Sequence, residues 1–542
     1  MRAKAEQCAV CLVFAVTTVA AAATAPQLTI EIQDYATLPM TGAVDGPGQV
    51  MSLLARANFL REEPGVSKKR FFVNDLNGPL YILDKETKKF STYLDFNGRQ
   101  GRPGIFHKLP FENGFANGFI SFAFDPDYEH NGKFYTIHLE DPELPGSSAP
   151  DNANFPGLKT SGYSATPPIH TPGPILREAV LIEWTDTNTS NATFEGTARE
   201  LMRVQYNTRI HPMADLIFNP TAKPGDPDWR VLYVASGDGG SGESKNPEMR
   251  SNPQRLDTLV GKILRIIPDL GEHKDTSRVS DSGRYRVPND NPFAAKSGAR
   301  PEIWATGLRN PSRLSWDVDP AHPDKSALIA DVIGLYTWET VVIIHRGANY
   351  GYSLREGNQK LQPNNQTAEL PEDDRIPVQI SAATTDGTVT PTYPVIQYGH
   401  VDGGGDAVSS GYVYRGKRIP ALRGKYIFGD ISTGNVWYVD YPDLLAADDG
   451  DHKTLAAMRP VKIRWTKPRG GGSETYGSMS PITEAAYHAR GGKASGLPGT
   501  AKVAQGRADI HFCVASDGEL YILSKSDGMI RAVVSATTGL SQ

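Results

Sequence analysis

Cysteine is scarce in this chain, which limits how the fold can be stabilised. Only three cysteines occur among 542 residues, and Cys8 and Cys11 lie in the N-terminal apolar run. If that run is removed, Cys513 alone remains and no disulfide can form within the chain. No CxxCH sequence occurs, which excludes a fused c-type cytochrome domain. The fold therefore has to rest on a large apolar core.

The chain also lacks an excess of positive charge and, beyond its N-terminus, long apolar runs. Its formal net charge is -5 and its pI is about 6.2, so it offers no basic surface to nucleic acid or to an anionic membrane. We therefore expect no nucleic-acid partner. No segment after residue 25 is apolar for long enough to cross a bilayer, so no membrane span is expected once the N-terminal segment is removed.

Residues 1–25 have the pattern of a secretory signal peptide. The positively charged start MRAKAEQ is followed by the apolar run CAVCLVFAVTTVAAAA, with small-residue cleavage options near Ala23 and Ala25. An uncleaved membrane anchor is the alternative, and the run is short for a membrane span. The sequence thus predicts a secreted or periplasmic protein.

Sustained helical periodicity is missing, and short β-meanders take its place. Residues 70–96 alternate apolar and polar positions on either side of turns. Leu80-Tyr81-Ile82-Leu83 reappears as Leu520-Tyr521-Ile522-Leu523, and similar turn-and-strand units occur at 231–234 and 424–440. Loose repeats of this kind favour an all-β propeller, with an unrelated antiparallel sandwich as the alternative.

The chain divides into four kinds of segment. After the signal peptide, residues 26–60 are predicted to form an irregular N-terminal arm, and residues 61–535 the β-propeller. Within the propeller, residues 141–174 are rich in Pro, Ser, Gly and Asn, and residues 361–389 are polar and acidic. We interpret both stretches as inserted loops.

One stretch, residues 211–240, carries the clearest chemical signal. Two apolar runs flank a turn rich in Pro, Gly and Asp, which predicts a β-hairpin. Such a hairpin brings His211, before the first strand, close to Asp238, after the second. A carboxylate beside an imidazole fixes its tautomer, so this pair can act as a general base, although a purely structural hydrogen bond is the commoner role.

Several further motifs follow in a fixed order: GKILRI (261–266), YRVPNDNPF (285–293), IWATGLRNPSRLSWD (303–317), a DV-G-WE stretch (331–339) and GANYGY (347–352). In this order the chain resembles the glucose/sorbosone dehydrogenase family over roughly residues 60–535. The resemblance implies a six-bladed β-propeller. It also implies hydride transfer from a sugar to pyrroloquinoline quinone (PQQ), with Ca²⁺ as a second cofactor and electrons passed to an external acceptor.

The resemblance also implies roles for individual residues. His211 matches the family's catalytic base, and Asp238 matches the aspartate that orients it. Arg309 and Asn310 match the Arg-Asn pair that contacts the quinone, whose carboxylates suit a guanidinium. Arg415 stands where the soluble glucose dehydrogenases carry a cofactor-binding lysine, and Arg507 matches a late cofactor arginine after a shift of one residue.

The metal loop departs from the family pattern. In residues 329–342, Ile333 is an extra residue and Leu335 replaces a glutamine that contacts the quinone in the soluble glucose dehydrogenases. Gly334 and Leu335 are the predicted Ca²⁺ ligands, because the family uses main-chain carbonyls here and these do not depend on side-chain identity.

Two alternatives remain open at this point. A non-catalytic binding propeller, like the Hedgehog-interacting relatives, fits the departure at Leu335, although those animal proteins are rich in cysteine. A Ca²⁺-dependent lactonase would need several Asp, Glu and Asn side chains that meet a metal at the central channel.

Overall fold

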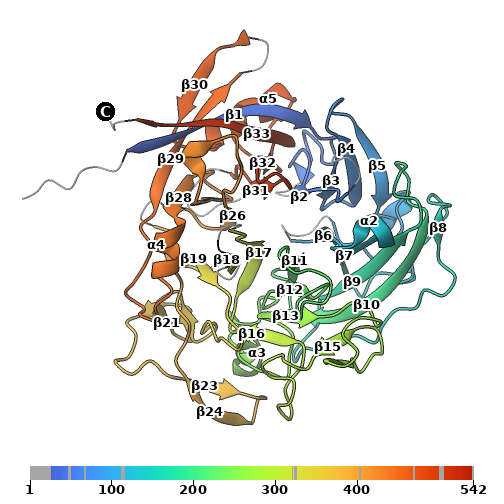
Figure 1. Ribbon diagram of the computed structural model, residues 1–542, viewed down its shortest axis with the longest axis vertical. Coiled ribbons are helices and arrows are strands. Elements are labelled where there is room, and N and C mark those ends of the chain that lie inside the picture. The colour runs from blue at the N-terminus through green and yellow to red at the C-terminus, as the bar shows by residue number, and fades with distance from the viewer. Residues whose placement is uncertain are drawn as a thin grey trace, which may run out of the picture.

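Strands follow the predicted turn signals along the whole described chain. The computed structural model describes residues 26–46, 51–65, 69–111, 116–319, 322, 326–401, 404–467, 470–499 and 506–539. The predicted signal peptide lies outside these residues. Within them the protein is all-β, as predicted, and its sheets surround a central region (Figure 1).

The first sheet contains the strands predicted in residues 70–96. Gly78, with φ of 133°, makes the turn between its second and third strands, where an added Cβ would lie 2.4 Å from Asp95 Oδ1. Only glycine fits this turn. The sheet is an antiparallel meander of β2 (Ala57–Glu62), β3 (Arg70–Asp75), β4 (Pro79–Asp84) and β5 (Phe90–Asp95).

The second sheet has the order β6-β7-β9-β10-β8, in which β8 pairs with β10 in parallel. Its strands are β6 (Phe119–Phe124), β7 (Lys133–Glu140), β8 (Leu158–Lys159), β9 (Arg177–Asp186) and β10 (Gly196–Tyr206). The predicted inserted loop, residues 141–174, therefore contributes only the short strand β8 among the elements described.

Two further four-stranded sheets continue the chain. Their strands are β11 (Met213–Phe218), β12 (Leu232–Ser236), β13 (Lys262–Ile266) and β16 (Ile303–Thr306), followed by β17 (Asn310–Trp316), β18 (Leu328–Ile333), β19 (Trp338–Ile343) and β25 (Ile396–Gly399). The hairpin predicted in residues 211–240 is confirmed, because β11 and β12 pair antiparallel with Met213 opposite Ser236.

Small peripheral sheets accompany these strands. They are formed by β14 (Ser277–Val279) and β15 (Arg286–Pro288), by β20 (Arg355–Glu356), β21 (Gln359–Leu361) and β22 (Thr367–Ala368), and by β23 (Ile376–Gln379) and β24 (Thr385–Val389). The predicted loop at 361–389 therefore contains strands of its own.

The last sheet has nine strands and contains two meanders joined by β1. Its path is β26 (Val408–Val413), β27 (Lys425–Asp430), β28 (Val436–Asp440), β29 (Arg459–Thr466), β1 (Gln27–Thr37), β33 (Met529–Gly539), β32 (Leu520–Ser524) and β31 (Ile510–Val514), with β30 (Ser473–Tyr476) on β29. β1 runs parallel to β29 and antiparallel to β33, as Figure 1 shows at the top of the molecule.

Strand β1 corrects the prediction of an irregular arm at residues 26–60. Leu28, Ile30 and Ile32 are buried while the residues between them are partly exposed, which is the period-two pattern of a strand. This alternation was present in the sequence. Its strand partners lie more than 400 residues away, so no local hairpin signal marked it.

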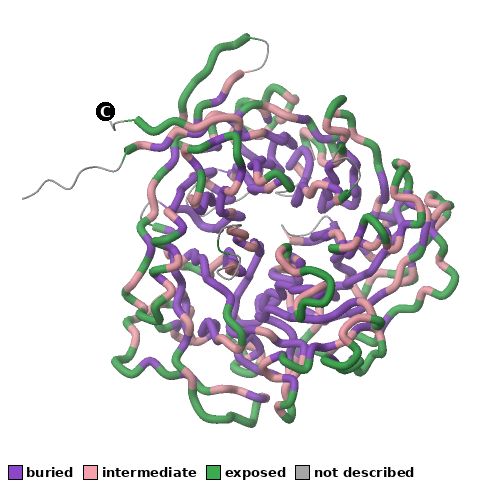
Figure 2. Tube along the Cα trace, in the orientation of Figure 1, coloured by how far each residue is buried: buried purple, intermediate pink, exposed green. Residues whose placement is uncertain are grey.

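The innermost strands form a closed ring. β2 contacts β6, β6 contacts β11, β11 contacts β17, β17 contacts β26, β26 contacts β31, and β31 contacts β2. Buried residues line these inner strands, while exposed residues lie on the outer loops (Figure 2). Because all these strands approach the centre, residues at their ends can share one central site.

Helices are short in the described chain. They are α2 (Tyr128–Asn131), α3 (Pro247–Ser251), α4 (Tyr441–Ala446) and α5 (Ser480–Ala489), with 3₁₀ turns at Arg99–Gly101 and Pro420–Leu422. In the part of the chain that is described, none is long and apolar enough to span a membrane. Cys513 is buried in β31 as a free thiol.

The packing of β1 gives a stability prediction. Ile32 is fully buried, so Ile32→Val should lower the free energy of unfolding by about 0.5–1.5 kcal/mol through the lost methylene and the cavity it leaves. Val279, which is 49% exposed, is the control, because Val279→Ala should change stability by less than about 0.5 kcal/mol. Urea unfolding measures both. Equal effects would contradict the packing of this strand.

Candidate active site

A cavity of about 460 Å³ lies at the ends of the inner strands. Its walls are formed by segments far apart in the sequence, including the loop before β11, the start of β17, the turn after β18 and the segments that flank β31 and β32. Of the predicted site residues, those that line it are His211, Arg309, Asn310, Gly334, Leu335 and Arg507. Asp238 lies directly behind His211, and Arg415 is the one that lies elsewhere.

His211 and Asp238 form the predicted pair. His211 Nδ1 lies 2.8 Å from Asp238 Oδ1, and both side chains are buried. Because an ionised carboxylate can only accept, Nδ1 carries the hydrogen and Nε2 keeps its lone pair for a ligand in the cavity. His211 has φ of 53°, a left-handed conformation that costs energy in a non-glycine residue and is typical of functional sites.

The turn after β12 holds Asp238 in the ionised form. Its Oδ1 accepts a hydrogen bond from Gly240 N (3.0 Å) and its Oδ2 from Gly242 N (2.9 Å). Burial alone would raise the pKa of Asp238, but the hydrogen bond from His211, the charges of His211 and Arg309 and the Gly240 amide lower it below its ordinary value. The carboxylate can therefore orient the imidazole and stabilise its protonated form.

Arg309 lies beside this pair. Its main-chain oxygen accepts a hydrogen bond from Asp238 N at 2.7 Å, so the two residues are held in register. The guanidinium Nη2 lies 3.5 Å from Glu243 Oε2, and the buried Nε has no hydrogen-bond partner among the described residues. Asn310 opens β17 next to it and also lines the cavity. An unpaired buried donor on the wall suits an anionic ligand.

The turn after β18 carries the predicted metal ligands. Glu356 Oε1 accepts hydrogen bonds from the main-chain N–H groups of residues 335–338 at 2.9 to 3.2 Å, which fixes the shape of this turn. Arg309 Nη1 donates to the carbonyls of Gly334 and, at 3.3 Å, of Ile333. The guanidinium of Arg309 therefore donates to the Gly334 carbonyl oxygen that was predicted to bind Ca²⁺. A Ca²⁺ ion at this oxygen would require Arg309 to move. The arrangement does not fit Ca²⁺.

Carboxylates in the cavity do not form a metal centre either. Among the described residues, Asp406 and Asp509 are the carboxylates that line it, and Asp509 is 3.3 Å from Lys525 Nζ. Across the described residues, no three His, Cys, Asp or Glu side chains are grouped as metal ligands. The carboxylate cluster that a Ca²⁺-dependent lactonase needs is thus not found in this part of the chain.

Arg415 does not reach the cavity, contrary to the prediction. Its Nε and Nη2 pair with Asp317 Oδ1 and Oδ2 at 2.8 and 2.7 Å, and its guanidinium lies 5.3 Å from the ring centre of Tyr441. Asp317 follows β17, whose first residue, Asn310, lines the cavity. Asn310 and Asp317 are seven residues apart, which corresponds to roughly 23 Å of strand, so Arg415 lies at the far end of the sheet.

Sequence reasoning missed a second wall of the cavity. It is formed by Arg313, Asp509, His511 and Lys525, all of which are buried and line the cavity. A signal was present, because residues 507, 509 and 511 are charged or ionisable at every second position before and within an apolar strand. Among the residues that the structure describes, the cavity is thus lined by four basic side chains, Arg309, Arg313, Arg507 and Lys525, and two carboxylates, Asp406 and Asp509. This excess of positive charge fits a flat polycarboxylate such as PQQ.

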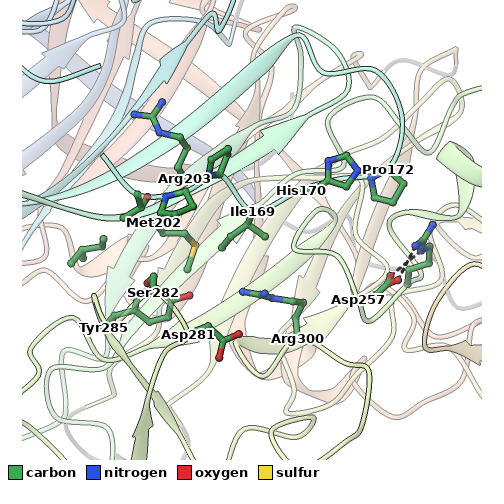
Figure 3. A pocket seen from close by; sticks show the side chains of 15 residues that line it. Ile169, His170, Pro172, Met202, Arg203, Asp257, Asp281, Ser282, Tyr285 and Arg300 are labelled. Atoms are coloured by element: carbon green, nitrogen blue, oxygen red, sulfur yellow. Dashed lines mark hydrogen bonds and ion pairs between the residues drawn. The ribbon is translucent and has the colours of Figure 1, made fainter. Parts of the chain in front are cut away.

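A larger pocket, of about 580 Å³, lies at the outer strand β10 (Figure 3). Ile169, His170, Met202, Tyr285 and Arg300 are among its walls, and no predicted site residue lines it. Its charged side chains are largely paired within the protein, as Arg255 is with Asp257 at 2.8 and 2.9 Å. The central cavity is therefore the better candidate for the active site.

Comparisons with known proteins find one matching family and several similar proteins. Residues 207–464 match the family described as Glucose / Sorbosone dehydrogenase. The HIPL2 protein of Arabidopsis thaliana is 29% identical over 404 residues, which cover 72% of this chain and 52% of that protein. Aldose sugar dehydrogenase YliI of Escherichia coli (strain K12) is 32% identical over 123 residues, or 23% of this chain and 26% of that protein.

A solved structure of glucose dehydrogenase is also similar, with 17% identity and a TM-score of 0.49 over 90% of this chain and 98% of that chain. The chain spans about half the length of the curated relatives it matches.

The fold and the site define an all-β protein with a buried His211–Asp238 pair at a central cavity lined by cationic side chains. Residues 207–464 of the chain match the model of the glucose/sorbosone dehydrogenase family, and the resemblance predicted from its motifs is confirmed over this segment. The matched segment contains His211, Asp238, Arg309 and the turn at Gly334, whereas Arg507 and Lys525 lie beyond it.

Proposed function

We propose that this protein is a quinoprotein sugar dehydrogenase, which oxidises the hydroxyl or hemiacetal carbon of a sugar-like substrate with PQQ as hydride acceptor. The observation that carries this proposal is the convergence, in one cavity, of an oriented base and an excess of cationic side chains. The family match and the similarity to an aldose sugar dehydrogenase are consistent with it.

The chemistry assigned to the protein is proton abstraction and positioning. His211 Nε2 accepts the proton of the substrate hydroxyl, and Asp238 stabilises the imidazolium that results. Arg309, Asn310 and Arg507 would hold the quinone, which would supply the two-electron acceptor when bound. The apolar walls, among them Ile120, Ile333 and Leu335, exclude water from the reacting atoms.

Ca²⁺ has no step in this scheme, because Arg309 engages the Gly334 carbonyl. In its place we assign the polarisation of the acceptor to the guanidinium of Arg309, which lines the same cavity. Electrons then pass to an external acceptor.

The proposed architecture is a six-bladed β-propeller. Each of the six strands of the closed inner ring is the first strand of one antiparallel meander. The six meanders are β2-β3-β4-β5, β6-β7-β9-β10, β11-β12-β13-β16, β17-β18-β19-β25, β26-β27-β28-β29 and β31-β32-β33-β1. In this interpretation β1 closes the propeller, because it completes the C-terminal meander with a strand from the N-terminus. The N-terminal apolar run adds the proposal of a secreted or periplasmic location.

A non-catalytic binding propeller is the second candidate. Two observations favour it: Leu335 stands at the family's glutamine position, and Arg309 engages the Gly334 carbonyl. An intact and strained His211 next to Asp238 favours the enzyme, because a protein that only binds a partner has no need of a base.

The direct test is reconstitution of the purified protein with PQQ, followed by an aldose panel with an artificial electron-accepting dye. Sugar-dependent dye reduction that requires PQQ is the expected result. Binding of PQQ without turnover of any aldose, alcohol or polyol would leave the binding protein as the better description.

A further inference from the structure

Lys525 lies on the side of the cavity opposite His211. The ring order β2, β6, β11, β17, β26, β31 separates β11 from β31 by two strands in either direction, and Figure 1 shows these strands on opposite sides of the centre. His211 precedes β11, whereas Lys525 follows β32, which pairs with β31. Both residues line the same cavity. A ligand that fills the cavity therefore meets an ionisable side chain at each end.

The side chains around Lys525 offer its ammonium one hydrogen-bond acceptor fewer than its contacts suggest. Its Nζ lies 2.8 Å from His511 Nε2 and 3.3 Å from Asp509 Oδ1, while Arg313 Nη2 lies 3.1 Å from His511 Nδ1. A neutral imidazole has one N–H and one acceptor nitrogen, and Arg313 keeps its protons at any ordinary pH. When Arg313 donates to Nδ1, Nε2 carries the hydrogen and can only donate, so this contact disfavours the ammonium of Lys525 relative to the neutral amine and makes the ammonium a ready proton donor.

The surrounding charges act in both directions. Burial disfavours the ammonium most strongly, Asp509 favours it, and Arg313, Arg56 and Arg507 disfavour it, so that the pKa of Lys525 is lowered to about 8. Burial and the neighbouring Lys525, Arg313 and Arg507 hold the pKa of His511 well below its usual range, so this imidazole stays neutral. Asp509 is held in place with φ of 51°, another left-handed non-glycine residue on the cavity wall.

We propose that Lys525 is a second proton-transfer residue of the cavity, which donates a proton to a carbonyl oxygen of the bound ligand while His211 accepts one from a hydroxyl group. The inference rests on the proposed function, because it assigns the acid of that reaction. It carries over no role from the family motifs, since Lys525 lies outside the segment that matches the family.

Protons and electrons balance in this scheme. The substrate loses a hydride from carbon and a proton from oxygen, and its carbon–oxygen single bond becomes a carbonyl. The hydride goes to an acceptor of the quinone class, whose carbonyl oxygen takes up one proton. His211 receives the hydroxyl proton and the ammonium of Lys525 supplies the other, so the total charge of the cavity does not change. Exchange with solvent then restores both residues.

The first test measures Lys525 without any quinone. Reductive methylation with formaldehyde and borohydride between pH 6 and 10, followed by peptide mass spectrometry, reports the fraction of neutral amine. Half-maximal labelling of Lys525 is expected near pH 8, and the exposed Lys223, labelled in the same samples, is the reference. An inflection as high as that of Lys223, or no labelling at pH 10, would show a locked ion pair with Asp509 and overturn the inference.

The second test uses Lys525→Arg, which keeps the positive charge but cannot release a proton near neutral pH. It should lower kcat about tenfold or more at unchanged KM and remove the alkaline limb of the pH–rate profile, whereas Lys223→Arg should change neither. A variant with wild-type kcat and an intact alkaline limb would overturn the inference. If labelling shows the low inflection but no sugar is oxidised, the proposed function fails and the amine remains as described.

Discussion

Replacement of His211 by alanine should lower kcat for sugar-dependent dye reduction by about 10²–10⁴-fold, the range that a positioned general base contributes. The imidazole is the proposed base of the cavity, and Asp238 at 2.8 Å fixes its tautomer. The dissociation constant for PQQ should change little, since the loss concerns proton abstraction. Steady-state kinetics on the reconstituted protein, with a separate PQQ titration, measure both quantities.

His170→Ala is the matched control for this experiment. His170 is exposed and lines the pocket at β10, and its Nδ1 contacts only Gln205 Oε1, at 3.1 Å, in the described chain. Its removal should leave kcat within about twofold, because surface substitutions change little. Equal activity of the His211 and His170 variants would contradict the role of the base.

Replacement of Arg309 by methionine should weaken PQQ binding about 10–10²-fold. The guanidinium lines the cavity with a buried, unpaired Nε, and charge-assisted hydrogen bonds to carboxylates are worth about 1.5–3 kcal/mol each. Loss of the contact to the Gly334 carbonyl would also loosen the turn after β18. Titration monitored by the absorbance of the quinone gives the dissociation constant.

Arg415→Lys tests whether the quinone binds in the central cavity or at the position that the family motif indicates. The motif predicted a cofactor contact at Arg415, but its partner in the structure is the buried carboxylate of Asp317, which lysine can still pair with. The PQQ dissociation constant should therefore stay within about twofold of the wild-type value. If the Arg415 variant lost PQQ and the Arg309 variant kept it, the cavity would not be the quinone site.

The sequence was sufficient for the β architecture because its signals are local. Alternation and turn residues in 70–96 and 211–240 specify hairpins whose strands are neighbours in the chain. Strand β1 escaped prediction for the opposite reason, since both of its partners are at the other end of the chain. When the partners of a strand are distant, its only local signal is the alternation of apolar and polar residues. This signal was too weak to assign residues 27–37 to a strand.

The candidate site could be predicted only in part. His211 and Asp238 were found because one hairpin brings them together, and the motifs supplied Arg309, Asn310 and Arg507. Motif position alone was misleading at Arg415, because it does not tell which end of a strand faces the centre.

His511 and Lys525 share the hairpin of β31 and β32, whereas Arg313 comes from β17 in another sheet and meets them only when the inner ring closes. No spacing in the sequence brings Arg313 to this pair.

Titration of the purified protein with PQQ tests the central claim most directly, because both the base and the cationic wall are assigned to a reaction with this quinone. Saturable binding of one quinone per chain, at micromolar concentration or below and weakened in Arg309→Met, is the predicted result. Absence of binding at millimolar PQQ in folded protein would contradict the quinoprotein account and leave the cavity as a site for another anion.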